Sequence, residues 1–440
     1  MKLKKFYRLN SQIKYLFLFL FILGCSFSGS KFWTDSKKIK NSASKEKILF
    51  SNKEFQENEF NPTLKINFKE HKQSYLYKKN FSNKKERLNF DFDISNYSKF
   101  KLKKNKKFST YNFNINHYSN GLLIHNENGT VLNFDKNLNL VWKQNIYNKK
   151  DKKLSPFLFF NNNENHLIVT DDLANYYLLD MNDGNIIWKK KNSSPFNSQI
   201  KIFGDKFFAL DRNNEFKCFS ISDGNLIWSF KTENLLVKSK KRLSIILDGA
   251  FVYFSNSIGD ISAVDIINGD LKWQISTQGD EIYSTSHNFE MSDLVLHDNR
   301  ILLANNRNDF YSISKNNGFI NWRQNINSDL DPIIFDNYVL IVTNSGFFVV
   351  IDEKNGNILR QTNIFKILNK KNKGNINATG FTVGNKNIYI TTDHGELVVA
   401  DILSGNPVSY YKLSKKKLSN PISVHEKLYL LEESSVIEIN

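Results

Sequence analysis

The sequence has few of the residues and patterns that would fix its structure by cross-links or membrane insertion. It contains only two cysteines, Cys25 and Cys218, so a chain whose Cys25 carries lipid cannot form an internal disulfide. Its longest leading apolar run covers residues 15–23 and is too short to cross a bilayer as a helix. No stretch after this run shows a helical period. The fold is therefore expected to be built from strands.

The usual patterns of catalytic and cofactor sites are also missing. The chain has no Walker loop, no dinucleotide glycine fingerprint and no recognisable Ser–His–Asp elbow. The eight histidines show no metal-ligand spacing, since His287 and His297 lie ten residues apart and the others are scattered. Asp331, before Pro332, is a lone carboxylate that we interpret as structural. We predict no enzymatic activity, no cofactor and no metal, and Cys218 is expected to be a buried core residue.

The charge is distributed unevenly along the chain. Residues 108–440 carry 35 basic and 35 acidic side chains, so the net charge of +17 belongs to the first 107 residues. A basic chain suggests nucleic-acid binding only when the folded part carries the excess. We therefore predict no nucleic-acid partner. The densest lysine run, at residues 99–107, could instead lie on an anionic membrane surface, or it could simply reflect the heavy use of lysine in this chain.

A nine-residue repeat outranks every other signal in the sequence. Its best copies place Asp or Ser first, Gly four residues later and Trp four residues after the Gly. The first copy is one residue shorter, and the last two have Arg360 and Ser409 in place of Trp. We assign these positions structural roles in turns and in packing between neighbouring units. The residues are Asp135 and Trp142; Asp180, Gly184 and Trp188; Gly224 and Trp228; Asp265, Gly269 and Trp273; Gly318 and Trp322; Asp352 and Gly356; and Asp401 and Gly405.

Each period contains four short apolar runs separated by Gly, Asn and Asp turns, as residues 199–230 illustrate. Four-stranded units of this length suit the blades of a β-propeller. The chain ends with three strands of a further blade, so we expect the missing outer strand to come from within residues 88–108. The prediction is an all-β, eight-bladed propeller over residues 108–440, with seven blades as the alternative.

The N-terminal residues 1–24 have the form of an export signal, with a basic start and a short apolar core. Residues 22–25, Ile-Leu-Gly-Cys, are similar to a lipobox, although Leu23 is bulkier than usual, and this predicts lipidation of Cys25. The following Ser26 favours sorting to the outer membrane in bacterial lipoproteins of this kind. Residues 25–107 are predicted to form a basic, largely disordered tether.

The repeat resembles the pyrroloquinoline-quinone (PQQ)-like propeller repeat. With the lipoprotein leader in front, the chain is similar to the BamB family, propeller lipoproteins of the outer-membrane β-barrel assembly machinery. The resemblance covers about residues 108–440. It implies a non-enzymatic scaffold at the periplasmic face of the outer membrane, whose partner is the β-barrel assembly complex. The long connections at residues 276–298 and 362–384 are candidate contact loops.

Two other functions stay open at this point. The first is a PQQ- and calcium-dependent dehydrogenase, which would need free oxygen ligands at the propeller axis. The second is a propeller lipoprotein that binds a solute or a glycan. The partner-contacting residues do not follow from the resemblance, because they belong to loops that this sequence does not match position by position.

Overall fold

The computed structural model describes residues 57–68, 79–85, 87–101, 116–118, 121–126, 128–233, 239, 241–277, 289–368, 376–424 and 426–440. The signal peptide, Cys25 and His287 lie outside these residues. Residues 57–440 belong to one compact unit. The helices among the described residues are single turns: α3 (Lys79–Ser82), α4 (Lys149–Lys152) and the 3-10 turn η2 (Ile364–Ile367). In this part of the chain we found no helix with the length and apolar character needed to span a membrane.

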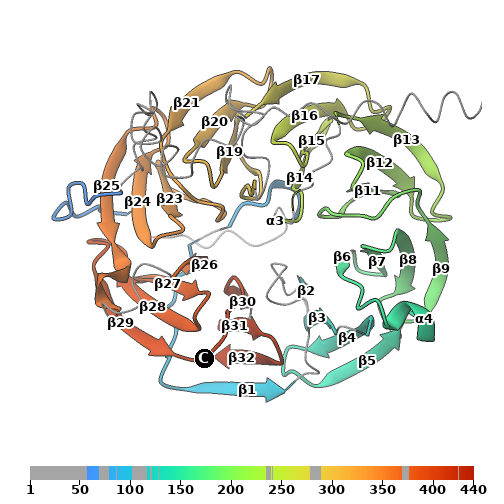
Figure 1. Ribbon diagram of the computed structural model, residues 1–440, viewed down its shortest axis with the longest axis horizontal. Helices are drawn as coiled ribbons and strands as arrows, with labels where there is room; N and C mark the ends of the chain where they lie inside the picture. The colour runs from blue at the N-terminus through green and yellow to red at the C-terminus, as the bar shows by residue number, and fades with distance from the viewer. Residues whose placement is uncertain are drawn as a thin grey trace, which may run out of the picture. The chain divides into compact units, whose positions relative to one another are not determined.

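Eight four-stranded antiparallel sheets follow one another around a central axis (Figure 1). The predicted fold class and the count of eight blades are thus confirmed. Blades 1 to 4 comprise β2 (Asn116–Tyr118), β3 (Gly121–His125), β4 (Thr130–Asp135) and β5 (Leu140–Asn145); β6 (Leu158–Asn162), β7 (His166–Asp171), β8 (Asn175–Asp180) and β9 (Ile186–Lys191); β10 (Lys201–Phe203), β11 (Lys206–Leu210), β12 (Glu215–Ser220) and β13 (Leu226–Lys231); and β14 (Ile245–Asp248), β15 (Phe251–Ser255), β16 (Asp260–Asp265) and β17 (Leu271–Ser276).

The second half of the ring repeats this plan. Blades 5 to 8 comprise β18 (Val295–His297), β19 (Arg300–Ala304), β20 (Phe310–Ser314) and β21 (Ile320–Gln324); β22 (Ile333–Phe335), β23 (Tyr338–Val342), β24 (Phe347–Asp352) and β25 (Ile358–Asn363); β26 (Ala378–Val383), β27 (Asn387–Thr392), β28 (Glu396–Asp401) and β29 (Pro407–Lys412); and β30 (Ile422–Val424), β31 (Lys427–Glu432), β32 (Ser435–Ile439) and β1 (Tyr97–Lys101).

The ring is closed by the composite blade that the sequence predicted. Strand β1 pairs antiparallel with β32, in a register that runs from Tyr97 opposite Ile439 to Lys101 opposite Ser435. An N-terminal strand thus supplies the outer edge of the last blade. This pairing satisfies the backbone of β32, which would otherwise be an open edge next to the chain terminus.

A β-bulge recurs at the same place in blades 1 to 7. In blade 2, Leu178 pairs with Trp188 and Leu179 pairs with Ile186, so Ile187 is the extra residue of the outer strand. The other six blades shift register at the same step. Because a bulge re-aims the side chains that follow it, the Trp that comes next turns toward the neighbouring blade.

The hydrophobic core lies between the blades. Successive strand residues point to opposite faces of a sheet, so each blade feeds two cores. Phe207 packs in a cluster with blade 2, whereas its neighbour Phe208 packs in a cluster with blade 4. Cys218 is fully buried in this second cluster, and burial raises the pKa of its thiol to about 12. The thiol is therefore held protonated in an apolar setting, in keeping with a core residue.

Candidate functional site

The repeat forms the joints between neighbouring blades. Gly269, at φ +79°, lies beneath the indole of Trp228 from the preceding blade, and a Cβ on this glycine would come 2.5 Å from the ring. Gly184 lies in the same way against Trp142, with 2.6 Å to the ring. The other joints join Gly224 to Trp188, Gly318 to Trp273 and Gly356 to Trp322. Glycine is needed for the left-handed turn and for the close approach of the ring.

Four of the five indoles also donate a hydrogen bond to the backbone of the next blade. Trp142 Nε1 donates to the carbonyl of Met181 at 2.9 Å, and Trp188, Trp273 and Trp322 make the equivalent bond to Ile221, Lys315 and Glu353. Trp228 differs, because its Nε1 has no hydrogen-bond partner among the described residues. Four of the five Trp joints thus combine ring packing with one hydrogen bond that fixes the ring orientation.

The acidic residue of the repeat organises the turn itself. Asp135 Oδ1 accepts the backbone N–H groups of Asn137 and Asn139, both at 2.8 Å, and these bonds, with the one to Asn139 first, lower the pKa of its carboxyl. In the other copies the carboxylate accepts a backbone N–H two or three residues on, which is a local turn bond. The pairs are Asp180 with Asn182, Asp265 with Ile267, Asp352 with Lys354, and Asp401 with Ser404.

Arg360 takes the place of Trp at the joint between blades 6 and 7. Its side chain is fully buried and its Nη2 donates to the carbonyl of Ile402 at 3.1 Å, while Nη1 donates to Leu403 and, at 3.0 Å, to Leu64. The guanidinium lies 3.1 Å from the point where Gly405 would carry a Cβ. Burial lowers the pKa of Arg360 to about 10, against the attraction of Asp401. Arginine therefore serves here as a donor to the next blade, as Trp does elsewhere.

Blade 7 has Ser409 at the Trp position. In blade 8 the third strand, β32, pairs with β1, so no turn joins these two strands to receive an indole from blade 7. Phe92 and Ile94 fill the joint instead, in a cluster with residues of blades 7 and 8. The backbone N–H of Phe92 also donates to Tyr389 Oη at 2.8 Å. The two blades whose copy of the repeat lacks Trp are thus completed by residues that precede the first repeat.

These preceding residues form what we call the N-terminal strap, the described residues 57–68, 79–85 and 87–96. Phe60 exchanges two backbone hydrogen bonds of 2.9 Å with Gln361 on the outer strand of blade 6. Further on, Arg87 donates from Nε to the carbonyl of Gly384 at 3.2 Å, and its guanidinium lies 4.8 Å from the ring centroid of Phe335. The strap belongs to the segment predicted as a tether, and these described residues of its two ends pack on blades 6, 7 and 8.

Asn83 of the strap connects three blades near the axis. Its Nδ2 lies within hydrogen-bond distance of Gln199 Oε1 and Ser244 Oγ, both at 3.1 Å, and of the Leu294 carbonyl at 2.9 Å. Lys201 Nζ donates to Asn83 Oδ1 at 2.6 Å. The asparagine has φ +55°, which this residue type tolerates better than most. A single strap residue thus hydrogen-bonds to blades 3, 4 and 5 at their inner ends.

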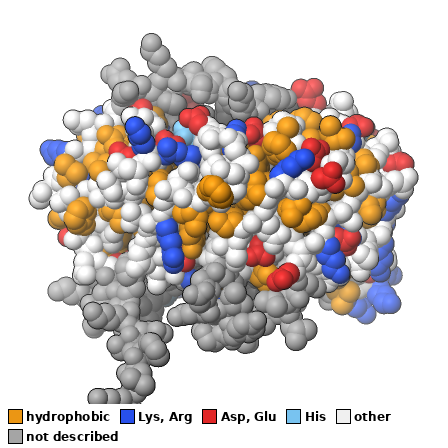
Figure 2. All heavy atoms as spheres, turned by 90° about the horizontal axis from the view of Figure 1, so that it is seen from above, with side chains coloured by type: hydrophobic (Ala, Val, Ile, Leu, Met, Phe, Trp, Pro, Cys, Tyr) orange, Lys and Arg blue, Asp and Glu red, His pale blue; other side chains and the backbone are white. Residues whose placement is uncertain are grey.

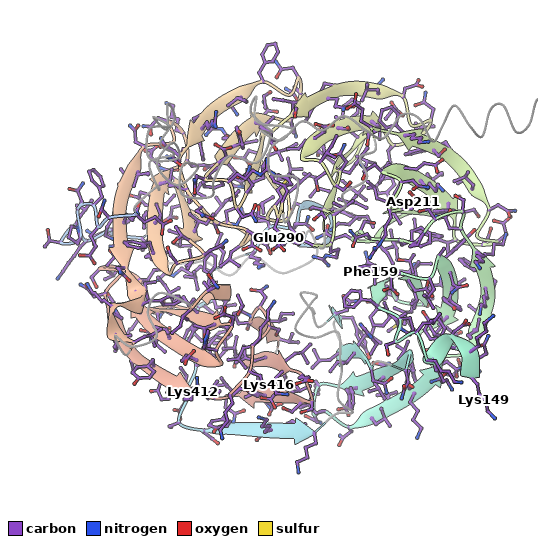
Figure 3. All side chains as sticks on the ribbon, in the orientation of Figure 1. Lys149, Phe159, Asp211, Glu290, Lys412 and Lys416 are labelled. Carbon is purple, nitrogen blue, oxygen red and sulfur yellow. The ribbon has the colours of Figure 1, made fainter. Side chains whose placement is uncertain are left out.

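A network of ion pairs surrounds Asn83. Lys85 of the strap pairs with Asp331 at 2.8 Å, and Asp331 Oδ1 accepts the backbone N–H of Asp293 at 2.9 Å. Asp293 in turn pairs with Arg242 at 2.7 Å. Glu290, from the same connection as Asp293, lies at the inner end of blade 5 (Figure 3). The segments that lead into the inner strands therefore converge at the propeller axis. We call the charged residues that meet there the axial cluster: Lys85, Lys201, Lys241, Arg242, Glu290, Asp293, Asp329 and Asp331.

The axial cluster shifts several pKa values. Burial opposes the charge of Asp331, but Lys85 and Lys241 outweigh burial and hold its pKa well below the usual range. Burial lowers the pKa of Lys201 to about 7, with Arg242 adding repulsion and Asp293 opposing the shift. Burial, then the charge of Asp329, raises the pKa of Glu290. Asp331, interpreted as structural from the sequence, is thus one member of a satisfied network.

The sequence missed the strap and the axial cluster. Asn83, Lys85 and Arg242 lie in segments without a periodic pattern, and only folding brings them together. The sequence did identify Arg360, since it stands four residues after Gly356, where other copies have Trp, but it gave no sign of the carbonyls that Arg360 binds. Of the two predicted contact connections, residues 278–288 and 369–375 lie outside the described part of the chain. Among the residues that are described, no group of three or more His, Cys, Asp or Glu side chains lies suitably for a metal ion.

Comparisons with known proteins agree with this architecture. The crystal structure of BamB from Moraxella catarrhalis is 15% identical with a TM-score of 0.61, over 78% of this chain and 98% of that chain. A europium-containing methanol dehydrogenase gives 11% identity and a TM-score of 0.62, over 81% and 88%. A quinohemoprotein alcohol dehydrogenase from Comamonas testosteroni gives 10% and 0.59, over 80% and 78%. Identities this low establish a shared fold alone.

No curated protein sequence matches the chain significantly. A family model does match, that of the outer membrane protein assembly factor BamB. It covers residues 127–362, which is more than half of the chain. This range includes both partners of all five Trp–Gly joints. The resemblance drawn from the repeat is thereby confirmed. The chain belongs to the BamB family of PQQ-repeat β-propellers.

Proposed function

We propose that this protein is a non-enzymatic scaffold, anchored by lipid at Cys25 to the periplasmic face of the outer membrane. In this role it holds protein partners during assembly and insertion of outer-membrane β-barrel proteins. Membership of the BamB family carries the proposal. The lipobox-like residues 22–25 and the export signal before them support the location.

The axial cluster argues for a scaffold over a quinone enzyme of the same fold. A calcium ion with its quinone would need carboxylate oxygens that are free to coordinate. Here Asp293 and Asp331 are each paired with a cation of the chain itself, at 2.7 and 2.8 Å. The described residues at the axis therefore do not fit a calcium–quinone site, and a titration with calcium and PQQ is expected to leave the absorbance spectrum unchanged.

The scaffold would work by rigid display. The joints and the strap fix the relative positions of the blades, so the described residues of the connections between blades are presented as one preformed surface. Pre-organisation of this kind lowers the entropic cost of binding. The partner we propose is a periplasmic domain of the barrel-assembly protein, docked on the connections at residues 276–298 and 362–384.

The test is a mild-detergent pull-down of the tagged, lipidated protein from membranes, followed by mass spectrometry. We expect recovery of the outer-membrane barrel-assembly protein. Shortening residues 276–298 or 362–384 should abolish it, whereas shortening the connection around α4 serves as the matched control. Recovery of the bait alone would contradict the proposal. Thermal-shift screens with solutes and glycans would then test the alternative, a propeller that binds a small ligand.

A further inference from the structure

A lysine of the strap is held by a histidine of blade 5. Lys84 Nζ lies 3.0 Å from Nδ1 of His297, the last residue of β18. An ammonium group can only donate hydrogen bonds, so Nδ1 is the acceptor. The ring is therefore neutral and carries its single proton on Nε2. The contact belongs to this protonation state alone, because a proton on Nδ1 would take the lone pair that Lys84 uses.

The other charged groups around the ring would favour its charged form. His297 Nε2 lies 3.7 Å from Oε1 of Glu353, on the outer turn of blade 6, and 3.7 Å from Oδ2 of the largely exposed Asp298. These distances are too long for hydrogen bonds but short enough to attract an imidazolium. Arg300, on β19, donates from Nη1 to the backbone carbonyl of Glu353. A ring that gained a proton would thus lose an ammonium neighbour and keep a carboxylate one.

The surroundings lower the pKa of His297. Burial lowers it first, Lys84 and Arg300 lower it further, and Asp298 opposes them. A histidine whose pKa falls on folding stabilises the folded state above its unfolded pKa, about 6.5, and loses that contribution as the pH falls below it. The same linkage applies to the docking of Lys84. Because docking lowers the affinity of the ring for a proton, a proton on the ring weakens docking by the same factor.

The segment around Lys84 is the part of the strap that reaches the axis. Helix α3 lies beside β14 inside the ring (Figure 1). Directly after it, Asn83 hydrogen-bonds to blades 3, 4 and 5, and Lys85 pairs with Asp331 before blade 6. Lys84 stands between these two residues and adds the contact with His297. A change at His297 therefore acts on the residues that connect blades 3 to 6.

We propose that Lys84 and His297 form a pH-sensitive latch for the strap. At neutral pH the latch holds residues 79–85 against the axis. Uptake of a proton by the ring releases Lys84 and draws the imidazolium toward Glu353. Histidine is the side chain that ordinarily titrates between pH 5 and 8, and little of it shows among the charged and apolar side chains on the side of blades 4 and 5 (Figure 2). The proposal concerns the strap and does not depend on the scaffold role.

The first test is NMR spectroscopy of residues 25–440 with isotope-labelled histidine and with Cys25→Ser, so that no lipid interferes. Long-range nitrogen–proton spectra distinguish the two neutral tautomers, and we expect His297 to carry its proton on Nε2 at pH 7.5. Lys84→Met should raise the pKa of His297, because it removes the group that competes with the proton for Nδ1. A proton on Nδ1, or an unchanged pKa of His297 in the variant, would overturn the proposal.

The second test measures release of the strap in the same chain, by limited proteolysis with a lysine-specific protease and mass spectrometry. Cleavage after Lys84 or Lys85 requires the segment to leave the axis. Each rate is divided by that of a synthetic peptide of residues 79–90, which cancels the pH dependence of the protease. We expect the corrected rate to rise about fivefold from pH 7.5 to pH 5.5. His297→Asn keeps an acceptor for Lys84 but cannot take up a proton, so its rate should change less than about twofold.

His394→Asn is the matched control. It removes a histidine whose Nδ1 lies 2.8 Å from the carboxylate of Asp393 instead of an ammonium group, so the rise should persist. Circular dichroism checks folding at both pH values, and His297→Gln replaces His297→Asn where that variant is unfolded. A flat rate in the parent chain, or an equal rise in the parent chain and His297→Asn, would refute the latch. A pull-down that yields only bait leaves both tests intact, so the two proposals fail independently.

Discussion

The contacts between neighbouring blades are made by different residues on the two sides of the ring. Between blades 1 and 6, a Trp from one blade rests on a Gly of the next, and residues close in sequence supply both partners. Around blades 6, 7 and 8, the strap supplies the contacts, through the Leu64 carbonyl at Arg360 and through Phe92 and Ile94 at the last joint. The first kind of joint can form as soon as two repeats exist. The second requires the whole ring.

Removing the closing segment should break the second kind of joint most severely. A chain that begins at residue 102 lacks β1, Phe92 and Ile94, which leaves the edge of β32 open and the core between blades 7 and 8 uncovered. We expect a loss of more than about 5 kcal/mol, comparable to the whole stability of many domains. Circular dichroism during thermal unfolding measures it. A chain that begins at residue 57 is the control, and equal midpoints for the two chains would contradict the closure.

The Arg360 joint should depend on the strap, whereas a Trp joint should not. Arg360→Met leaves three carbonyls without their donor, and we expect it to cost about 2–4 kcal/mol in a chain that begins at residue 57. In a chain that begins at residue 79, the cost should fall by about 1 kcal/mol because Leu64 is already absent. Urea unfolding gives these differences. Trp322→Met should cost the same in both chains. If shortening the chain lowered the cost of Arg360→Met no more than the cost of Trp322→Met, the coupling between Arg360 and the strap would be refuted.

Two glycines of blade 4 separate the demands of a joint from those of a turn. Gly249 has φ +58° and open space around it, whereas Gly269 has φ +79° and the Trp228 ring above it. Gly249→Ala should cost about 1 kcal/mol for the left-handed backbone alone. Gly269→Ala should cost about 1–3 kcal/mol more because the ring must move. Equal midpoints in urea would mean that the indole does not pack as described.

The contact between strap and axis should show itself in the pH dependence of stability. Burial lowers the pKa of Lys201 to about 7, so between pH 7 and 10 the unfolded chain binds a proton there that the folded chain has released. The contribution of this lysine to the free energy of unfolding therefore rises with pH across that window. The difference in stability between the native protein and Lys201→Met should grow from pH 7 to pH 10. Equal differences at pH 7 and pH 10 would mean that Lys201 is not buried as described.

Much of the fold could be predicted because the repeat is a local signal. Gly224 and Trp228 stand four residues apart, and their spacing alone indicates a turn followed by an outer strand. The closing strand was also predictable, since three strands after residue 420 leave one place empty. The axial cluster was not, because Asn83 and Leu294 are 211 residues apart and share no pattern. Their proximity depends on the number of blades that separate them.

The sequence by itself determined the blade, through short apolar runs, glycine turns and a Trp at a constant interval. These features act over a few residues, so they are readable without knowing what lies next to them. Only the tertiary structure decided which carbonyls the Arg360 guanidinium binds, how the strap completes blades 6 to 8, and which charges meet at the axis. Those contacts join segments distant in the chain, and they exist only once eight blades have come full circle.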